Sequence, residues 1–462
     1  MKKLMYLIPL AAIALASCSN EVIDQQSPQA SSFESDALVI RPIVQGATRG
    51  TVTTDANFSA FHAVATPTTG KFVTDAEGTQ EVAGSIDANV KKEGSKWVFD
   101  DGNTYYWKSK NTEATFVAYA PTGISTSGYT VKDNVADQQD IIVAYNEGTG
   151  SDFTSGVPLN FQHVLSQIII KALNKDANDF KIEVGGVKLY SVVNKGDLTL
   201  PTAVTDSPFD WTTYPTVWTI DNTSTATYTT GSTSRDATAV ATLTTVAADI
   251  ASAEGPMLLM PQQLTAATAE GLKDETLAGT KNVAGSYLAV LIRATDISKT
   301  VPETDATTGK YKKSDGSNLV DFDAWVDPTD KTAGTDPYDT YSQQTITDAA
   351  TGTLNGDALK MINEVKYPRE GYGNNSTQFA YVCVPIDTKW LPGYKYTYTL
   401  NFSKDGIGKI DPNFATGSSG SDYPGGTGGL TPGEDVIDNP IELFFTVTVD
   451  SWSDATDQSY DM

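Results

Sequence analysis

The chain has 462 residues, of which 57 are acidic and 32 are basic, and its formal net charge is −25. That charge argues against nucleic acid as a partner, because a phosphate-binding surface needs a basic face. It suits a soluble extracellular surface whose copies repel one another until a specific contact forms. The length predicts two or three domains, or one enlarged pair.

The first segment has the features of a bacterial lipoprotein export signal. Lys2 and Lys3 precede an apolar run at 4–15, and Leu-Ala-Ser leads directly into Cys18. The run is shorter than the ~20 residues of a bilayer span, and no later window reaches that length. We therefore predict a signal peptide at 1–17 and a lipid anchor of the palmitate kind on Cys18. The alternative is an ordinary secretory signal with an incidental Cys.

A polar tether and a first strand follow the signal. Residues 18–35 predict a flexible connection between lipid and fold. The apolar residues at 37–44 predict a strand, and the Gly-flanked segment after it, with Arg49 and Gly50, ends that strand. Pro42 has no amide donor, so this strand should lie at a sheet edge or be broken at its middle.

Short β-branched and aromatic segments recur along the rest of the chain between turn-forming residues, which predicts an all-β sandwich. The predicted strands lie at 58–65, 97–99, 105–107, 114–120, 140–145, 157–161, 164–172, 181–193, 240–246, 257–260, 287–293, 379–385, 394–402 and 441–449. Polar inserts at 221–236, 300–318 and 327–356 are expected on the surface.

The last strand is preceded by a segment of very different composition. Residues 415–434 are rich in Gly and Ser and predict a flexible linker. In the terminal strand at 441–450, Phe445, Val447 and Val449 point one way and the intervening threonines point the other.

Residues for an enzyme or a metal site are scarce. The two histidines, His62 and His163, have no matching nucleophile or ligand spacing, so we expect structural roles for them. Cys383 lies in an apolar run and is expected to be a buried small hydrophobe. The acidic loop at 327–339 lacks the spacing of an EF-hand, and calcium there is the alternative to a plain solvated loop. We predict no catalytic residue, no metal and no cofactor.

Five stretches form a series along the chain. They are an aromatic strand pair at 105–121, a Phe-x-His stretch at 157–168, a Pro-Gln turn at 260–263, a Tyr-rich strand at 392–400 and the terminal strand at 445–452. In this order, and together with the Leu-Ala-Ser-Cys lipidation motif that ends at Cys18, they resemble the fimbrillins, the subunits and accessory subunits of type V pili. The long inserts beyond residue 300 and the polar tail at 453–462 have no clear place in that pattern.

The resemblance implies a fold and a domain organisation. We expect two transthyretin-like, seven-stranded β-sandwich domains in series, at 36–161 and 162–462, with long surface inserts in the second. The boundary between them is placed anywhere in about 150–205.

The resemblance also implies a mechanism of assembly. A protease specific for arginine would cut between Arg49 and Gly50 and remove the first strand, taken as 37–48, and the groove left behind would accept a strand from another subunit. The donor strand would present five apolar side chains: Ile441, Leu443, Phe445, Val447 and Val449. The alternatives are that Arg49 is an ordinary loop residue and that the last strand stays in its own domain.

The leading hypothesis is therefore a structural and adhesive subunit of a fimbria at the outer membrane and cell surface, not an enzyme. Its partners would be other copies or related pilus subunits, outer-membrane lipid through Cys18 and a host glycan or protein receptor. The first alternative is a permanently lipid-anchored surface lipoprotein that binds a glycan or another ligand. The second is an anchored hydrolase that uses two carboxylates. Shaft, tip and anchor positions stay open.

Overall fold

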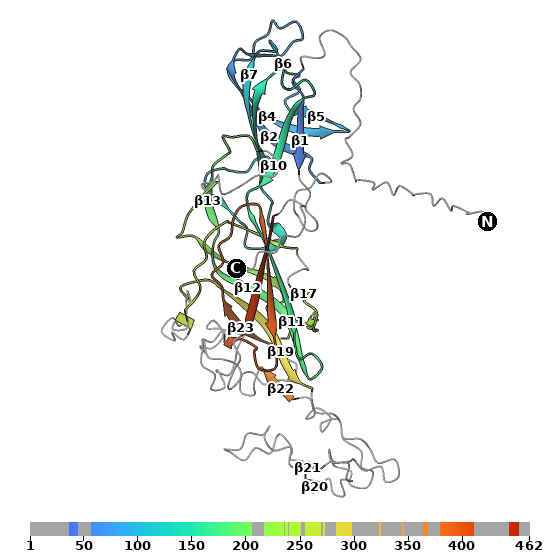
Figure 1. Cartoon of the computed structure of the whole chain (residues 1–462), viewed down its shortest axis with the longest axis vertical. Helices are drawn as coiled ribbons and strands as arrows, with labels where there is room; N and C mark the ends of the chain where they lie inside the picture. Colours follow the sequence, from blue (N-terminus) through green and yellow to red (C-terminus); the bar gives the residue numbers. More distant parts are fainter. Residues whose placement is uncertain are drawn as a thin grey trace, which may run out of the picture.

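The computed structural model describes residues 37–44, 57–205, 217–297, 379–410 and 443–451, except 235, 239, 251–254, 269–270 and 273–282, together with three short strands. These short strands are β20 (Asp323–Ala324), β21 (Gln344–Thr345) and β22 (Glu364–Tyr367). The regular secondary structure of the described chain is almost entirely strand, and the strands form several sheets (Figure 1). The predicted all-β fold is thereby confirmed.

The N-terminal part of the chain forms one seven-stranded sheet. Its strand order is β1 (Ile40–Val44), β10 (Val157–His163), β9 (Ile142–Thr149), β7 (Glu113–Ala120), β2 (Ala60–Thr69), β4 (Ile86–Glu93) and β5 (Lys96–Phe99). A small sheet of β3 (Phe72–Val73) and β6 (Tyr106–Trp107) accompanies it. Burial alternates along β7, so one of its faces turns toward a core.

Aromatic side chains dominate this first core. Phe58, Phe61 and Phe161 lie in mutual ring contact, with centroids 5.1–5.7 Å apart. Trp97 of β5 packs against the same group, with its ring centroid 5.2 Å from that of Phe58. Rings in such offset and edge-to-face arrangements add to the stabilisation that burial provides. We call the cluster of buried side chains between Leu38 and Phe161 the first core.

Two larger sheets and a small three-stranded one contain most of the remaining strands, and β20 pairs with β21 in a sheet of their own. One contains β17 (Ala248–Asp249), β11 (Ser166–Asn174), β24 (Tyr394–Phe402) and β26 (Phe444–Ser451), with β18 (Met257–Leu259) also paired to β11. Another contains β15 (Thr225–Gly231), β12 (Phe180–Val193), β19 (Tyr287–Asp296), β23 (Ala380–Pro385) and β25 (Lys409–Ile410), with β16 (Ala241–Thr242) and β22 also attached. The small sheet is β14 (Trp218–Ile220), β13 (Lys195–Leu198) and β8 (Tyr129–Thr130).

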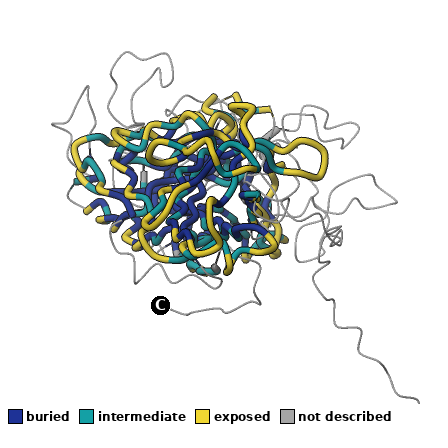
Figure 2. The backbone as a smooth tube through the Cα atoms, turned by 90° about the horizontal axis from the view of Figure 1, so that it is seen from above, coloured by how far each residue is buried: buried dark blue, intermediate teal, exposed yellow. Residues whose placement is uncertain are grey.

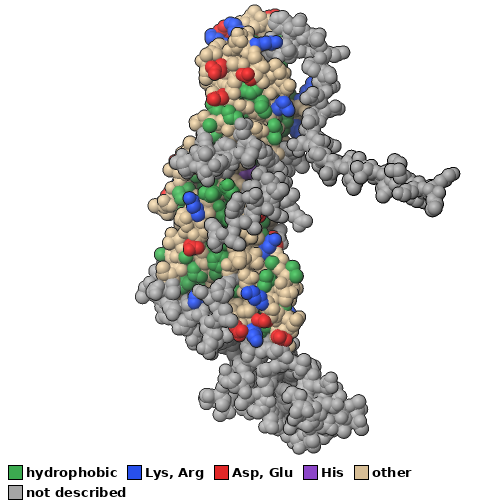
Figure 3. Space-filling view, viewed as in Figure 1, with side chains coloured by type: hydrophobic (Ala, Val, Ile, Leu, Met, Phe, Trp, Pro, Cys, Tyr) green, Lys and Arg blue, Asp and Glu red, His purple; other side chains and the backbone are tan. Residues whose placement is uncertain are grey.

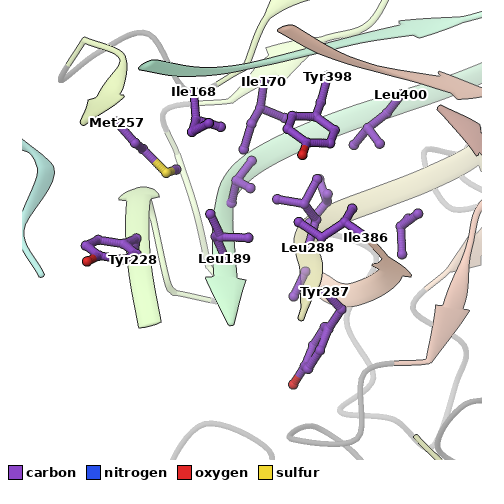
Figure 4. Packing of buried hydrophobic residues seen from close by; sticks show 14 of the residues in the cluster. Ile168, Ile170, Leu189, Tyr228, Met257, Tyr287, Leu288, Ile386, Tyr398 and Leu400 are labelled. Atoms are coloured by element: carbon purple, nitrogen blue, oxygen red, sulfur yellow. The ribbon is translucent and has the colours of Figure 1, made fainter. Parts of the chain in front are cut away.

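The second core lies among these sheets. Side chains from β11, β12, β19 and β24 meet there, as Ile170, Leu189, Leu288 and Tyr398 do in Figure 4. Viewed from above, buried backbone fills the interior and exposed backbone follows the rim (Figure 2). Cys383 belongs to this core and is 1% exposed, in agreement with its expected role as a small hydrophobe.

The two cores meet along β9 and along Ile141, the residue directly before it. Ile142 and Ala144 point into the first core, whereas Ile141 and Val143 point into the second. Alternation along one extended segment thus joins both cores. The second core also includes Val131 and Val135, and the predicted domain division stays a prediction.

Both histidines make structural contacts. His163 Nδ1 lies 2.9 Å from Asp140 Oδ2, and both side chains are buried at this junction. His62 lies on β2 with its Nδ1 3.1 Å from Asn89 Oδ1 and its Nε2 3.0 Å from Asp87 Oδ1.

One expected surface insert contains regular structure. Within 221–236, β15 pairs antiparallel with β12, and its Tyr228 is fully buried in the second core. A segment of mostly Thr with one inward aromatic fits a sheet because the pairing is made by the backbone. Of the other inserts, 300–318 lies outside the described residues and only β21 is described within 327–356.

Candidate functional site

Backbone hydrogen bonds hold β1 on one side and the residues directly before it on two sides. The strand runs parallel to β10, with Ile40 opposite Val157 and Val44 opposite Phe161. Val157 N donates to Val39 O at 2.7 Å, and on the other side Leu38 N donates to Tyr105 O at 2.7 Å. β1 ends the strand order of its sheet. The edge position expected from Pro42 is therefore confirmed.

The side chains of β1, and of Leu38 just before it, fill part of the first core. Leu38 is 6% exposed, and Ile40 and Val44 are each 3% exposed. Pro42, in the same alternating row, is half-buried. Full burial of such a side chain contributes about 1.5–3 kcal/mol. The strand therefore contributes side chains to the core and does not merely lie on its surface.

Strand β26 is the last described strand and also lies at a sheet edge. It runs antiparallel to β24 over its whole length, from Phe444 opposite Asn401 to Ser451 opposite Tyr394. Leu443, directly before it, is 7% exposed. In contrast to the inward residues of β1, Phe445, Val447 and Val449 are only half-buried.

Beside β26 in the same sheet, two tyrosines of β24 form part of the second core. Burial raises the pKa of Tyr396 to about 12, and its hydroxyl accepts a hydrogen bond from Leu391 N at 2.7 Å. Burial also raises the pKa of Tyr398 well above its usual range. The ring of Tyr398 lies 5.8 Å from that of Phe445, centroid to centroid. These hydroxyls stay neutral at physiological pH, so this wall of the core is an uncharged packing surface.

On the polar face of the β24–β26 pair, threonines lie opposite threonines and a lysine lies opposite an aspartate. Thr446 and Thr448 lie opposite Thr399 and Thr397. Near the end of the strand, Lys395 Nζ lies 3.5 Å from Asp450 Oδ2. Cross-strand Thr pairs and opposite charges of this kind each add a modest stabilisation to a sheet.

The predicted site residues fall into two groups. Leu443, Phe445, Val447 and Val449 lie in or directly before β26, as just described. The others lie outside the described residues, as do the signal at 1–17, the tether at 18–35, the linker at 415–434 and the acidic loop at 327–339; they are Cys18, Arg49, Gly50 and Ile441. β1 and β26 lie in different cores of this chain.

Sequence reasoning missed the groups that hold β1. The backbone of β10 pairs with that strand, and the carbonyl of Tyr105 accepts a hydrogen bond from Leu38 N just before it. Backbone groups are the same in every residue, so the sequence does not indicate which of them will pair. The alternating apolar residues Val157, Leu159 and Phe161 gave a partial signal, because they mark which face of β10 turns toward the core.

Neither a metal nor a membrane span emerges from the described residues. Among them, no group of three or more His, Cys, Asp or Glu side chains is placed to hold a metal ion. No helix in the described ranges has the length and apolarity needed to cross a bilayer.

Comparison with solved structures finds distant likenesses. A fimbrial protein from Bacteroides vulgatus is 13% identical, with a TM-score of 0.42 over 90% of this chain and 99% of that chain. A candidate cell adhesion protein from Bacteroides uniformis is 13% identical, with a TM-score of 0.33 over 90% and 98% of the two chains. One from Parabacteroides distasonis is 8% identical, with a TM-score of 0.35 over 91% and 98%. These TM-scores are too low to carry an argument, and no curated protein matches the sequence.

The family assignment follows from a family model instead. The model described as fimbrillin-like matches residues 47–295. This match covers more than half of the 462 residues and includes most of the first core and several strands of the second. The chain therefore belongs to the fimbrillin-like family, a family of structural subunits of surface fimbriae and not of enzymes.

Proposed function

We propose that this protein is a structural and adhesive subunit of a cell-surface pilus, assembled by donor-strand exchange after proteolytic removal of its first strand. The observation that carries the proposal is the position of β1. It is the first described strand of the chain, it lies at a sheet edge, and its inward side chains belong to the first core. One cut in the segment 45–56, which carries Arg49, would separate it from the rest of the fold.

Removal of β1 would leave a groove that lacks both backbone hydrogen-bond partners and buried side chains. The edge of β10 would lose its backbone partners, and the core would lose Leu38, Ile40 and Val44. At about 1.5–3 kcal/mol for each side chain, roughly 5–9 kcal/mol of burial would be forfeited. A groove of this kind strongly favours the addition of another strand.

The terminal strand suits this groove in spacing and in backbone. Leu443, Phe445, Val447 and Val449 alternate with the same two-residue period as the inward row of β1. Strand β26 has no proline, so each of its residues offers an N–H to a ladder. The inward side chains of β26 are only half-buried in its own sheet, whereas Ile40 and Val44 of β1 are almost fully buried. Transfer to the groove of another copy would therefore bury more apolar surface than β26 buries in its own sheet.

The remaining elements of the proposal concern anchoring and partners. Lipid on Cys18 would hold the uncut precursor at the outer membrane, and a cut after Arg49 would discard the anchor together with β1. The partners would then be other copies or related subunits and a host glycan or protein receptor. We also propose the division into two transthyretin-like domains, each with its own core.

The described surface gives no support to the alternative of a glycan-binding lipoprotein. Trp107, Trp218 and Trp390 are buried, and Trp97 is half-buried against Phe58 and Phe61. On the face shown in Figure 3, basic and acidic side chains are interspersed. Stacking on sugar rings needs an exposed aromatic face, and the described residues supply none among their tryptophans.

The proposal is tested by treating the purified precursor with a protease specific for arginine. We expect cleavage after Arg49, a new N-terminus at Gly50, and ladders that resist SDS on gels. The control Arg49→Lys keeps the charge but should block both cleavage and ladders. Val447→Asp should permit cleavage but block ladders, because a charge would enter an apolar groove. Clean cutting at Arg49 without any polymer would refute assembly by strand exchange.

A further inference from the structure

Strand β1 and the residues directly before it carry apolar side chains on both faces, with Arg41 as the one charged residue on the outward face. Apolar side chains on both faces are hazardous for an edge strand. The inward residues are buried, while Val39 and Ile43 on the outward face are 48% and 38% exposed. An apolar strand at a sheet edge is a template for pairing with another copy of the same chain. The fold therefore needs some device that keeps this edge closed.

The hydrogen bonds around β1 determine which backbone groups face outward. Val157 N donates to Val39 O, which turns residue 39 toward β10. Leu38 N donates to Tyr105 O, which turns residue 38 the opposite way. In a strand, the N–H and C=O of alternate residues point to opposite neighbours. Odd-numbered residues of β1 thus face β10, and even-numbered residues face the outer edge.

Pro42 is even-numbered, so the N–H that it lacks is missing from the outer edge. Between Ile40 and Ile43, no described residue makes a backbone hydrogen bond to that edge. A second strand paired with this edge would find no N–H donor at residue 42, in the centre of the ladder of hydrogen bonds. The pairing of β1 with β10 is untouched, because Arg41 and not Pro42 faces that neighbour.

We propose that Pro42 closes the outer edge of β1 to strand addition by a second copy of this chain. Prolines on edge strands are a known means of blocking edge-to-edge association. Here the proline lies at the centre of a strand that has apolar side chains on both faces. The exposed charge of Arg41 lies beside it. The uncut chain is thereby kept from pairing through β1. This proposal concerns the uncut chain and does not depend on strand exchange.

The neighbouring strand supplies a matched control. Pro158 lies opposite Arg41 in the β1–β10 pair. Since Val157 N faces β1, residue 158 faces away from it, and Pro158 O accepts from Asn146 Nδ2 at 2.6 Å. A change of Pro158 to valine therefore makes the same chemical substitution but adds no donor to the outer edge of β1.

The test uses the mature chain with Cys18→Ser, so that lipid is absent, and Arg49→Ala, so that it stays uncut. Sedimentation equilibrium is run over a range of protein concentration with Pro42, with Pro42→Val and with Pro158→Val. We expect the parent and Pro158→Val to keep the monomer mass. Pro42→Val should approach twice that mass as concentration rises, and in the dimer the amide of residue 42 should gain protection from hydrogen exchange.

A second pair of variants keeps the outcome decisive. Adding Ile43→Lys to Pro42→Val should restore the monomer, because a charge on each β1 would repel its copy. If Pro42→Val does not fold, Pro42→Ala adds the same N–H with less bulk. A folded Pro42 variant that stays monomeric at every concentration would overturn the proposal. So would equal association of the Pro158→Val control.

Discussion

The two edge strands β1 and β26 are held in opposite ways. β1 has five residues, a proline at its centre and a parallel partner, but its inward side chains Ile40 and Val44 are almost fully buried. β26 has eight residues, no proline and an antiparallel partner along its whole length, but its inward side chains are only half-buried. Parallel pairing is slightly less stable per residue than antiparallel pairing. Thus β1 depends mainly on its side chains, and β26 depends mainly on its backbone.

This difference bears on the roles that we propose for the two strands. A strand held by its side chains leaves a deep, specific groove once it is cut away. A strand held by its backbone carries its hydrogen-bonding capacity to any groove of the right spacing.

The largest effect is expected from deleting β1. A chain that begins at Gly50 lacks Leu38, Ile40 and Val44, so its free energy of unfolding should fall by roughly 5–9 kcal/mol as an upper estimate. Measurement by urea denaturation, with binding of a hydrophobic dye to the exposed groove, checks this. A chain that lacks only residues 19–36 is the control. Equal stability of the two truncated chains would contradict a core role for β1.

A matched pair of single substitutions tests the contrast directly. Val44→Ala removes two methyl groups from a buried site, and the expected loss is about 2–3 kcal/mol. Val447→Ala makes the same change in half-buried β26, and the expected loss is about 1 kcal/mol. Urea denaturation of both variants gives the comparison. Equal losses would show that β26 is held by its side chains as firmly as β1.

A smaller effect is expected on the polar face of β26. Asp450→Asn removes the charge that lies 3.5 Å from Lys395 Nζ, at side chains 22% and 35% exposed. Because partly exposed ion pairs contribute little, the expected loss is about 0.5 kcal/mol. The loss should disappear at high salt, where such pairs are screened. A loss that persists in high salt would point to packing and not charge.

The smallest effect concerns the short sheet against which β1 begins. Ala37 bridges to Tyr106 of β6, and nearby Glu81 binds both Lys108 and Lys71. Hydrogen bonds from Lys108 and then Lys71 lower the pKa of Glu81 to about 2 from an ordinary 4.5. A lowered carboxyl pKa stabilises the fold above pH 4.5, and the contribution is lost as pH falls toward 2.

Glu81→Gln is the variant that checks this pH dependence. Its melting temperature should lie slightly below that of the parent at pH 6, and the difference should vanish near pH 2. The difference should be small because all three side chains are well exposed. A difference that stays constant from pH 6 to pH 2 would show that the carboxylate charge is not responsible.

Much of the fold could be predicted because its signals are local. Pro42 indicated an edge strand, and alternation in 445–449 indicated the two faces of β26. The segment 221–236 misled because its composition is polar, although Tyr228 is buried in the second core. One inward aromatic among threonines is a weak signal, and pairing with β12 is made by backbone groups that every residue carries.

The candidate site was predictable only in part. The first strand was identified by its run of apolar residues at 37–44 and the last by its apolar alternation, since each of these patterns lies within one short segment. The neighbours of β1 were not, because Tyr105 and β10 lie far from it along the chain and contribute a carbonyl and an edge.

By itself, the sequence determined that the chain is all-β, that a proline interrupts the donors of its first strand and that its last strand alternates. These are properties of short segments, set by side-chain type and period. Only the tertiary structure decided that the missing N–H of Pro42 faces outward, that β1 is buried deeply and that β26 is buried shallowly. Such facts depend on which strands become neighbours, and that choice is made by the packing of residues distant in the chain.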